Sequence, residues 1–201
     1  MGLNSWDDEK DGNTPLDEDE SEGLIPVHIS KRAELNEWEA ENIRAAIEWA
    51  ELRTPDMLEE KALRTLHRRM FDKTWAWAGK YRTSDKSIGP YQWHEVPRLM
   101  SDLIENTKAQ YERAKHSPEQ LDAVAARFHH QLVLIHPWPN GNGRHAREAT
   151  DLLLRRWGRP AFSWGRASKR AEDQDVRGEY LGALRAADSG NFEALMRFVR
   201  S

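Results

Sequence analysis

The sequence predicts an all-α fold with at most one small hairpin. Apolar residues recur at intervals of three and four in several long segments, a spacing that places them on one face of a helix. Two segments begin with a capping residue followed by proline, which is a favoured order at a helix start. The 201 residues contain no long alternation of apolar and polar residues and no internal repeat.

Two helices are predicted in the first half of the chain, after a short apolar stretch at 24–29. Ser30 can cap the first helix, which we expect to run to Leu52. Thr54-Pro55 is expected to start the second. Its apolar face comprises Leu58, Leu63, Leu66, Met70 and Phe71. Residues 81–93 have no helical period, and Gly89-Pro90 indicates a loop or irregular hairpin there.

Five further helices are predicted in the second half. One spans about 96–111, and Ser117-Pro118 opens the next. This fourth helix should stop near His136, because a proline disfavours helical geometry in the residue before it. Helical spacing resumes at 144–157, and two closing helices are expected at 176–187 and 192–199.

The composition excludes several classes of site. The chain has no cysteine, which rules out disulfides, thiol catalysis and cysteine-bound zinc. Its longest apolar runs fall far short of the roughly 20 residues of a spanning helix. The N-terminal segment is polar and acidic, unlike a signal peptide. We therefore expect a soluble, cytoplasmic protein without a membrane partner.

The net charge of −4 hides a division between two regions. Residues 1–23 form an acidic leader with nine acidic residues and one basic residue, while residues 24–201 hold 25 acidic and 29 basic residues. The leader can mask the basic body or remain solvated, and composition alone favours solvation. The surplus of basic residues in 24–201 is too diffuse to predict direct nucleic-acid binding. We expect a flexible leader followed by one domain.

The stretch from His136 to Arg147 carries the most chemical information. Gly141-Asn142-Gly143 can turn successive backbone N–H groups into one concavity at the start of a helix, where the helix dipole also favours an anion. Arg144 and Arg147 share a face of that helix, and His136 can act as a base near neutral pH. Each element alone is more often structural, but their joint order within twelve residues favours a phosphate site.

This stretch resembles the signature of the Fic (filamentation induced by cAMP) family, His-Pro-Phe-x-Asp/Glu-Gly-Asn-Gly-Arg-x-x-Arg. Seven of its residues match: His136, Pro137, Gly141, Asn142, Gly143, Arg144 and Arg147, and Trp138 replaces phenylalanine. Residues 66–83 and 180–199 also resemble the family, so the resemblance covers about 24–199. The leader is similar to that of a Fic subgroup labelled mobile mystery protein B, which is associated with mobile elements and a helix-turn-helix companion.

The resemblance implies a Fic-type helical bundle with a small β-hairpin flap and protein adenylyltransferase activity. Such an enzyme moves AMP from ATP to a Ser, Thr or Tyr hydroxyl of a target protein. His136 would be the general base, and residues 141–143 would cradle the phosphates, with the Asn142 side chain contributing. Arg144 and Arg147 would hold the β- and γ-phosphates, while Trp138 would anchor the loop.

One motif position departs from the family pattern. The carboxylate that would bind magnesium is replaced by Asn140, and a neutral amide is a weaker ligand for Mg²⁺. We expect Mg²⁺ to be used with a weakened site. Two alternatives remain open: phosphoryl transfer on the same scaffold, and a non-catalytic Fic module that regulates by binding.

The resemblance places a flap at 81–89 that would bind a target backbone by strand addition. The candidate residues are Thr83, Ser84, Asp85, Lys86, Ser87, Ile88 and Gly89. Ile88 can clamp the target, while Arg82 and Lys86 can equally be solvated. Without the family match, an ordinary surface hairpin would be the preferred interpretation.

Two alternatives are open for how the activity would be inhibited. Many Fic proteins are silenced by a glutamate that pairs with the second motif arginine, and Glu22-Gly23 matches the end of that motif. Glu22 is therefore a possible inhibitory residue opposite Arg147. The other alternative is an antitoxin or helix-turn-helix companion that restrains a toxin-like protein.

The remaining histidines do not predict a metal centre. His129, His130 and His145 have no carboxylate at a ligand-like spacing, and His129 and His130 face different sides of one helix.

Overall fold

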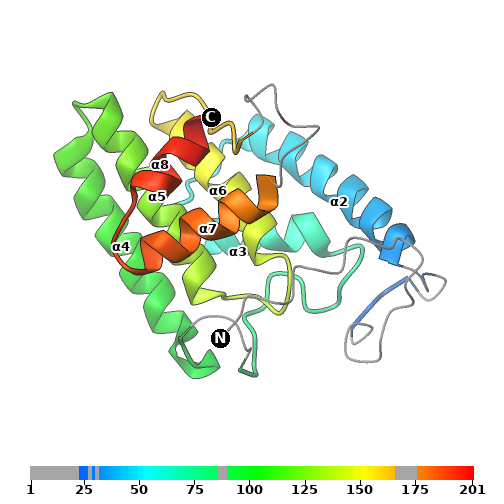
Figure 1. Cartoon of the computed structure of the whole chain (residues 1–201). Coiled ribbons are helices and arrows are strands. Elements are labelled where there is room, and N and C mark those ends of the chain that lie inside the picture. The colour runs from blue at the N-terminus through cyan, green and yellow to red at the C-terminus, as the bar shows by residue number, and fades with distance from the viewer. Residues whose placement is uncertain (1–22, 27–28, 30–31, 86–89, 166–175) are drawn as a thin grey trace.

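The computed structural model describes residues 23–26, 29, 32–85, 90–165 and 176–201. Within these residues the chain is helical, as predicted, and it contains no β-strand (Figure 1). The elements are α2 (Arg32–Arg53), α3 (Glu60–Phe71), the short 3₁₀ helix η3 (Trp93–Glu95), α4 (Val96–Ala114), α5 (Pro118–Ile135), α6 (Asn142–Arg156), α7 (Val176–Asp188) and α8 (Glu193–Arg200).

Helix α5 occupies the centre of the bundle. It packs against α4 on one side and α6 on the other, and α8 also contacts it. Helices α2 and α4 lie at opposite sides of the molecule (Figure 1). Phe128 and Leu132 of α5 and Leu153 of α6 are fully buried, as their helical spacing predicts. The loop that joins α5 to α6 is therefore held between two core helices.

The boundaries of α5 follow from local sequence. The Ser117 side chain accepts a hydrogen bond from the Gln120 N–H at 3.4 Å, so the predicted cap is present. At the other end His136 adopts φ 52° and ψ 59°, which terminates the helix before Pro137. Helix α6 begins at Asn142, two residues earlier than predicted, because Gly141 serves as its N-cap.

The predicted start of the second helix at Thr54-Pro55 is wrong. Thr54 has φ 42° rather than the extended geometry of a capping residue, and α3 begins only at Glu60. The Asp56 carboxylate accepts the Leu58 N–H at 2.9 Å, which closes a local turn that competes with a helix. Leu58 is still buried, but it reaches the core from that turn.

The stretch after the leader packs against the segment that follows α3. Leu24 and Trp75 form an isolated antiparallel bridge. The Ile25 N–H donates to Thr74 O, and the Ala76 N–H donates to Gly23 O, both at 2.8 Å. Residues 1–22, including Glu22, lie outside the described residues.

Candidate active site

The loop between α5 and α6 is braced by one asparagine side chain. Asn142 accepts the backbone N–H of Trp138 at 2.9 Å and donates to the carbonyl of the same residue at 2.8 Å. Because both polar atoms of this buried side chain bond within the loop, Asn142 braces the loop. Its role as a phosphate ligand, which the resemblance implied, stays a prediction. The backbone N–H groups of Asn142, Gly143 and Arg144 begin α6 and have no partner within the helix, so they can face an anion.

Gly141 is required by the shape of this loop. It has φ +77°, and a Cβ atom at this position would lie 2.5 Å from Cζ of Phe71. Its N–H donates to Oδ1 of Asn140 at 2.5 Å, while its carbonyl accepts from the His145 N–H at 2.9 Å. Asn140 is exposed, so the position that carries a carboxylate in the Fic signature is accessible but holds a neutral amide.

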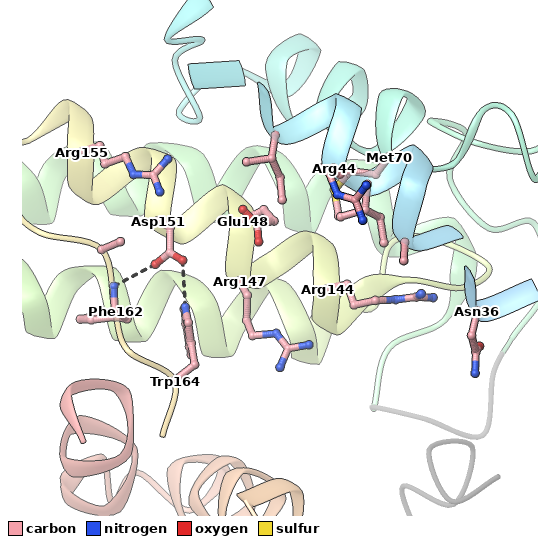
Figure 2. A pocket seen from close by; sticks show the side chains of 14 residues that line it. Asn36, Arg44, Met70, Arg144, Arg147, Glu148, Asp151, Arg155, Phe162 and Trp164 are labelled. Carbon is pink, nitrogen blue, oxygen red and sulfur yellow. Dashed lines mark hydrogen bonds between the residues drawn. The ribbon is translucent and has the colours of Figure 1, made fainter. Parts of the chain in front are cut away.

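Arg144 and Arg147 lie one turn apart on α6, as predicted. Figure 2 shows both guanidinium groups extending from this helix. Arg144 forms an ion pair with Glu39 of α2 at 2.5 Å and lies over the ring of Phe71, 5.1 Å from its centroid. Arg147 lies over the ring of Tyr180, 5.8 Å from its centroid.

These two arginines line a cleft of about 830 Å³. It is lined by residues of α2 and α6, by Met70 of α3 and by Ala161, Phe162 and Trp164. The cleft extends from Arg144 along α6 to Arg155 and does not include His136 or the glycines of the loop. The two arginines thus stand between the loop and the cleft.

One wall of the cleft is fixed by Asp151, which the sequence analysis did not single out. Its carboxylate accepts the Phe162 N–H at 3.0 Å and the indole N–H of Trp164 at 2.9 Å (Figure 2). Burial raises the pKa of Asp151, although these two hydrogen bonds oppose the shift. Asp151 therefore holds residues 162–164 against α6.

The motif loop rests on an aromatic and imidazole cluster. Trp138 is fully buried, as expected of an anchor, and stacks on His67 with 4.3 Å between ring centroids. Nδ1 of His67 accepts the Gly79 N–H at 2.9 Å, so Nε2 carries the proton and donates to Asn140 O at 3.1 Å. In the same way, Nδ1 of His145 accepts the Trp138 indole N–H at 3.2 Å and Nε2 donates to Leu63 O at 3.0 Å.

Burial has the largest effect on the pKa values of the two histidines in this cluster. It lowers the pKa of His145 from 6.5 to about 4, although the hydrogen bond to Leu63 opposes the shift. It also lowers the pKa of His67 well below 6.5, with the proximity of His145 as the next cause. Both rings are neutral at pH 7 and can therefore make the bonds above. His67 was not predicted as a site residue, although it lies four residues after Leu63 on the apolar face of α3.

The two histidines at the middle of α5 are engaged separately. Nε2 of His129 lies 2.8 Å from the Tyr180 hydroxyl, and Nε2 of His130 lies 2.8 Å from Oδ1 of Asp188. Among the residues that the structure describes, no three His, Cys, Asp or Glu side chains are grouped as a metal site. These contacts give His129 and His130 structural roles between α5 and α7.

Residues 82–85 and 90–91 lie beside the loop. Oδ1 of Asp85 accepts the Trp93 N–H at 2.7 Å, and Thr83 and Ser84 form a bend without strand pairing. Lys86, Ser87, Ile88 and Gly89 lie outside the described residues. Arg82, for which solvation was one expectation, is buried instead, and it donates from Nε to the carbonyl of His136 at 2.8 Å.

Comparison with known families decides which domain this loop belongs to. Residues 57–154, from the turn before α3 almost to the end of α6, match the family model described as Fic/DOC family. The chain belongs to the Fic/DOC family. This match includes every described residue of the motif, and it confirms the resemblance that the sequence showed. The mobile mystery protein B subgroup stays a prediction.

Relatives of this Fic chain include named adenylyltransferases. It is 30% identical over 125 residues to "Protein adenylyltransferase fic-1" of Caenorhabditis briggsae, covering 61% of the chain and 22% of that protein. It is 32% identical over 125 residues to "Protein adenylyltransferase Fic" of Nematostella vectensis, covering 61% of the chain and 26% of that protein. The match thus spans about a quarter of these relatives or less.

Solved structures share the fold of this Fic chain. BepC from Bartonella tribocorum, solved with bound AMPPNP, has a TM-score of 0.69 at 17% identity, covering 92% of this chain and 97% of that one. Fic-1 from C. elegans has a TM-score of 0.62 at 23% identity, covering 90% of this chain and 51% of that one. Within the described residues, none of the helices has the length and apolar character needed to span a bilayer.

Proposed function

We propose that this Fic chain is a protein adenylyltransferase that moves AMP from ATP to a Ser, Thr or Tyr hydroxyl of a target protein. The observation that carries the proposal is the placement of Arg144 and Arg147, one turn apart at the N-terminal end of α6, beside the loop that begins with His136. Two guanidinium groups next to free helix N–H groups suit a polyphosphate. The names of the adenylyltransferase relatives support the same reaction.

The proposed chemistry requires one general base and one anion site. His136 takes the proton of the target hydroxyl while the hydroxyl oxygen forms a bond to the α-phosphorus of ATP. The bond between the α-phosphorus and the bridging oxygen breaks, and pyrophosphate leaves with that oxygen. Arg144 and Arg147 neutralise the charge on the leaving β- and γ-phosphates, and the N–H groups of residues 142–144 hold the phosphates in line.

The protein itself offers Mg²⁺ a poor ligand. At the loop position where the family carries its metal-binding carboxylate, this chain has Asn140. The side-chain oxygen of Asn140 already accepts the Gly141 N–H. A neutral amide in that position offers Mg²⁺ no charge. We therefore propose that Mg²⁺ arrives bound mainly to the phosphates of ATP, with Asn140 as a weak ligand.

Target binding and regulation remain proposals from the resemblance. The segment from Thr83 to Gly89 would bind an extended stretch of the target, and Asp85 with its neighbours supports its near end. The chain would be the toxin-like member of a regulated pair in the cytoplasm, restrained by an antitoxin or helix-turn-helix companion. Inhibition by Glu22 of the leader is the alternative. Deletion of residues 1–23 tests it: unchanged auto-modification would argue for a separate companion.

The transfer reaction is tested with ATP labelled on either the α- or the γ-phosphate. We expect label on protein only from α-labelled ATP, and none with the His136→Ala variant. Label only from γ-labelled ATP would replace the proposal with phosphoryl transfer. No label from either, with the leader-deleted chain also silent, would favour a non-catalytic regulatory module, for which Asn140 is the supporting feature.

A further inference from the structure

Arg82 is a buried charged residue outside the Fic motif. It lies between the motif loop and the segment that the resemblance assigns to the flap, and its side chain is among the largest that are almost completely buried. A buried guanidinium is stable only if its N–H groups find acceptors, so the identity of its acceptors defines its role.

On one side Arg82 holds the backbone of the proposed general base. Its Nε–H donates to the carbonyl of His136 at 2.8 Å, and its own backbone N–H donates to the carbonyl of Pro137 at 2.9 Å. His136 has φ 52°, a left-handed conformation that non-glycine residues adopt only when their surroundings impose it. These two hydrogen bonds from one residue hold the carbonyls of two consecutive peptides, the one after His136 and the one after Pro137, and so support this conformation.

On the other side Arg82 bonds the carbonyl of one residue within the flap segment at 81–89 and that of one residue after it. Nη1 donates to Ser84 O at 3.0 Å, and Nη2 donates to Tyr91 O at 2.7 Å. Asp85 is a weaker partner, 3.5 Å from Nη1 and largely exposed. A single planar group therefore bonds the carbonyls of Ser84, Tyr91 and His136 in three directions.

This arrangement depends on the shape of arginine rather than on its charge alone. The guanidinium presents donors along a rigid fork, whereas a lysine ammonium is a point donor on a flexible stem. Lysine would preserve the charge and most of the buried stem, but it could not bond carbonyls that surround the fork on three sides. The Arg82→Lys substitution thus separates the positioning contacts from burial and charge.

We propose that Arg82 is a positioning residue that fixes His136 relative to the target-binding segment. This inference rests on the proposed function for the role of His136 as base and for the role of residues 83–89 in binding the target. The alternative is that Arg82 merely stabilises the fold. In that case its loss would lower stability without altering the orientation or reactivity of His136 in the molecules that remain folded.

The kinetic test compares Arg82→Lys with Arg98→Lys. Arg98 is an exposed arginine of α4 whose ion pairs with Glu95 and Asp102 lysine can retain. We expect Arg82→Lys to lower kcat for AMP transfer roughly 10- to 100-fold, the cost of a displaced catalytic group. The Kd for ATP should stay unchanged, since Arg144 and Arg147 are untouched. Equal kcat in folded Arg82→Lys and wild type would overturn the proposal.

A second measurement does not depend on catalysis. In protein labelled on histidine ring carbons, the His136 resonance, assigned with His136→Ala, should move in Arg82→Lys while those of His129 and His145 stay in place. Unmoved His136 signals in the folded variant would overturn the proposal. If wild type transfers no AMP, the labelled-ATP result rejects the proposed function, and the resonances still decide the positioning.

The wild-type chain supplies the test if Arg82→Lys does not fold. The Nε–H of Arg82 should exchange with solvent much more slowly than that of Arg98, because it is buried and bonded to His136 O. Exchange of Arg82 as fast as that of Arg98 would overturn the contact on which the proposal stands.

Discussion

Glu39 of α2 and Arg144 of α6 form an ion pair between residues 105 positions apart in the chain, with Oε2 and Nη1 separated by 2.5 Å. The other carboxylate oxygen of Glu39 accepts the Trp75 indole N–H at 2.6 Å. Glu39 is buried, while Arg144 is partly exposed at the mouth of the cleft. The first arginine of the Fic motif is thus occupied by a protein carboxylate, and an incoming phosphate must compete with it.

Glu39→Gln should therefore bind ATP more tightly. Glutamine retains an acceptor for the Trp75 indole but removes the negative charge that holds Arg144. Because such a partly exposed ion pair is worth about 1 kcal/mol, we expect the Kd for ATP to fall roughly fivefold. Isothermal titration calorimetry measures this, with Glu37→Gln, an exposed residue of the same helix, as the control. Weaker binding by Glu39→Gln would mean that Glu39 orients Arg144 rather than competing for it.

Asn140→Asp should restore a magnesium ligand. The side chain is exposed at the loop, so a carboxylate there can reach a cation on the ATP phosphates. We expect a severalfold fall in the magnesium concentration that gives half-maximal AMP transfer. Asn106→Asp adds the same charge at an exposed position of α4, outside the cleft, and should leave this concentration near its wild-type value. Identical magnesium dependence of Asn140→Asp and wild type would remove residue 140 from the metal shell.

Features governed by neighbouring residues could be predicted from the sequence. The cap at Ser117, the end of α5 at His136 and the turn at Gly141 depend on local backbone geometry, so the order of helices and the motif loop were recognisable. The start of α3 was not, because the Asp56 side chain captures the Leu58 N–H and delays the helix.

Contacts made across the fold could not be predicted. Arg82 donates to the carbonyls of His136 and Tyr91, which only the tertiary fold brings beside it, and no sequence spacing predicts such a contact. Glu39 is one of several acidic residues in α2, and only the packing of α2 beside α6 distinguishes it from solvated neighbours. The burial of His67 could have been predicted, since a histidine among apolar residues on one helix face is a candidate for a buried polar contact.

Acid should destabilise the protein through His145. The unfolded chain binds a proton on this residue near pH 6.5, whereas the folded chain binds it only near pH 4. The unfolding free energy should fall as pH drops through that window, with His145 contributing about 1.4 kcal/mol per pH unit. Urea titrations from pH 7 to 4.5 measure the slope, which should be shallower in His145→Gln.

The exposed His116 provides the control for this slope. His116→Gln replaces only a solvent-exposed side chain, so this variant should keep the wild-type dependence of the unfolding free energy on pH. A slope in His145→Gln as steep as that of wild type would assign the acid sensitivity to other buried groups, of which His67 and His129 are the first candidates.

The carboxylate of Asp122 joins α5 to α8. Asp122 accepts hydrogen bonds from Arg159 at 3.1 Å and from Arg200 at 2.7 and 2.9 Å. Burial of Asp122 alone would raise its pKa, but the hydrogen bonds from Arg200 and Arg159 outweigh it and the pKa is lowered. The ionised carboxylate therefore stabilises the fold at neutral pH, and this contribution is lost as pH falls below the ordinary value of 3.8.

Asp122→Asn should cost about 2–4 kcal/mol of unfolding free energy, because it leaves two partly buried guanidinium groups facing a neutral amide. Asp102→Asn is the matched control: it breaks an Asp–Arg pair of 2.8 Å in which both side chains are more than half exposed. Such a surface pair should cost less than about 0.5 kcal/mol. Urea denaturation at pH 7 compares the two, and equal losses would mean that the Asp122 cluster contributes no more than a surface ion pair.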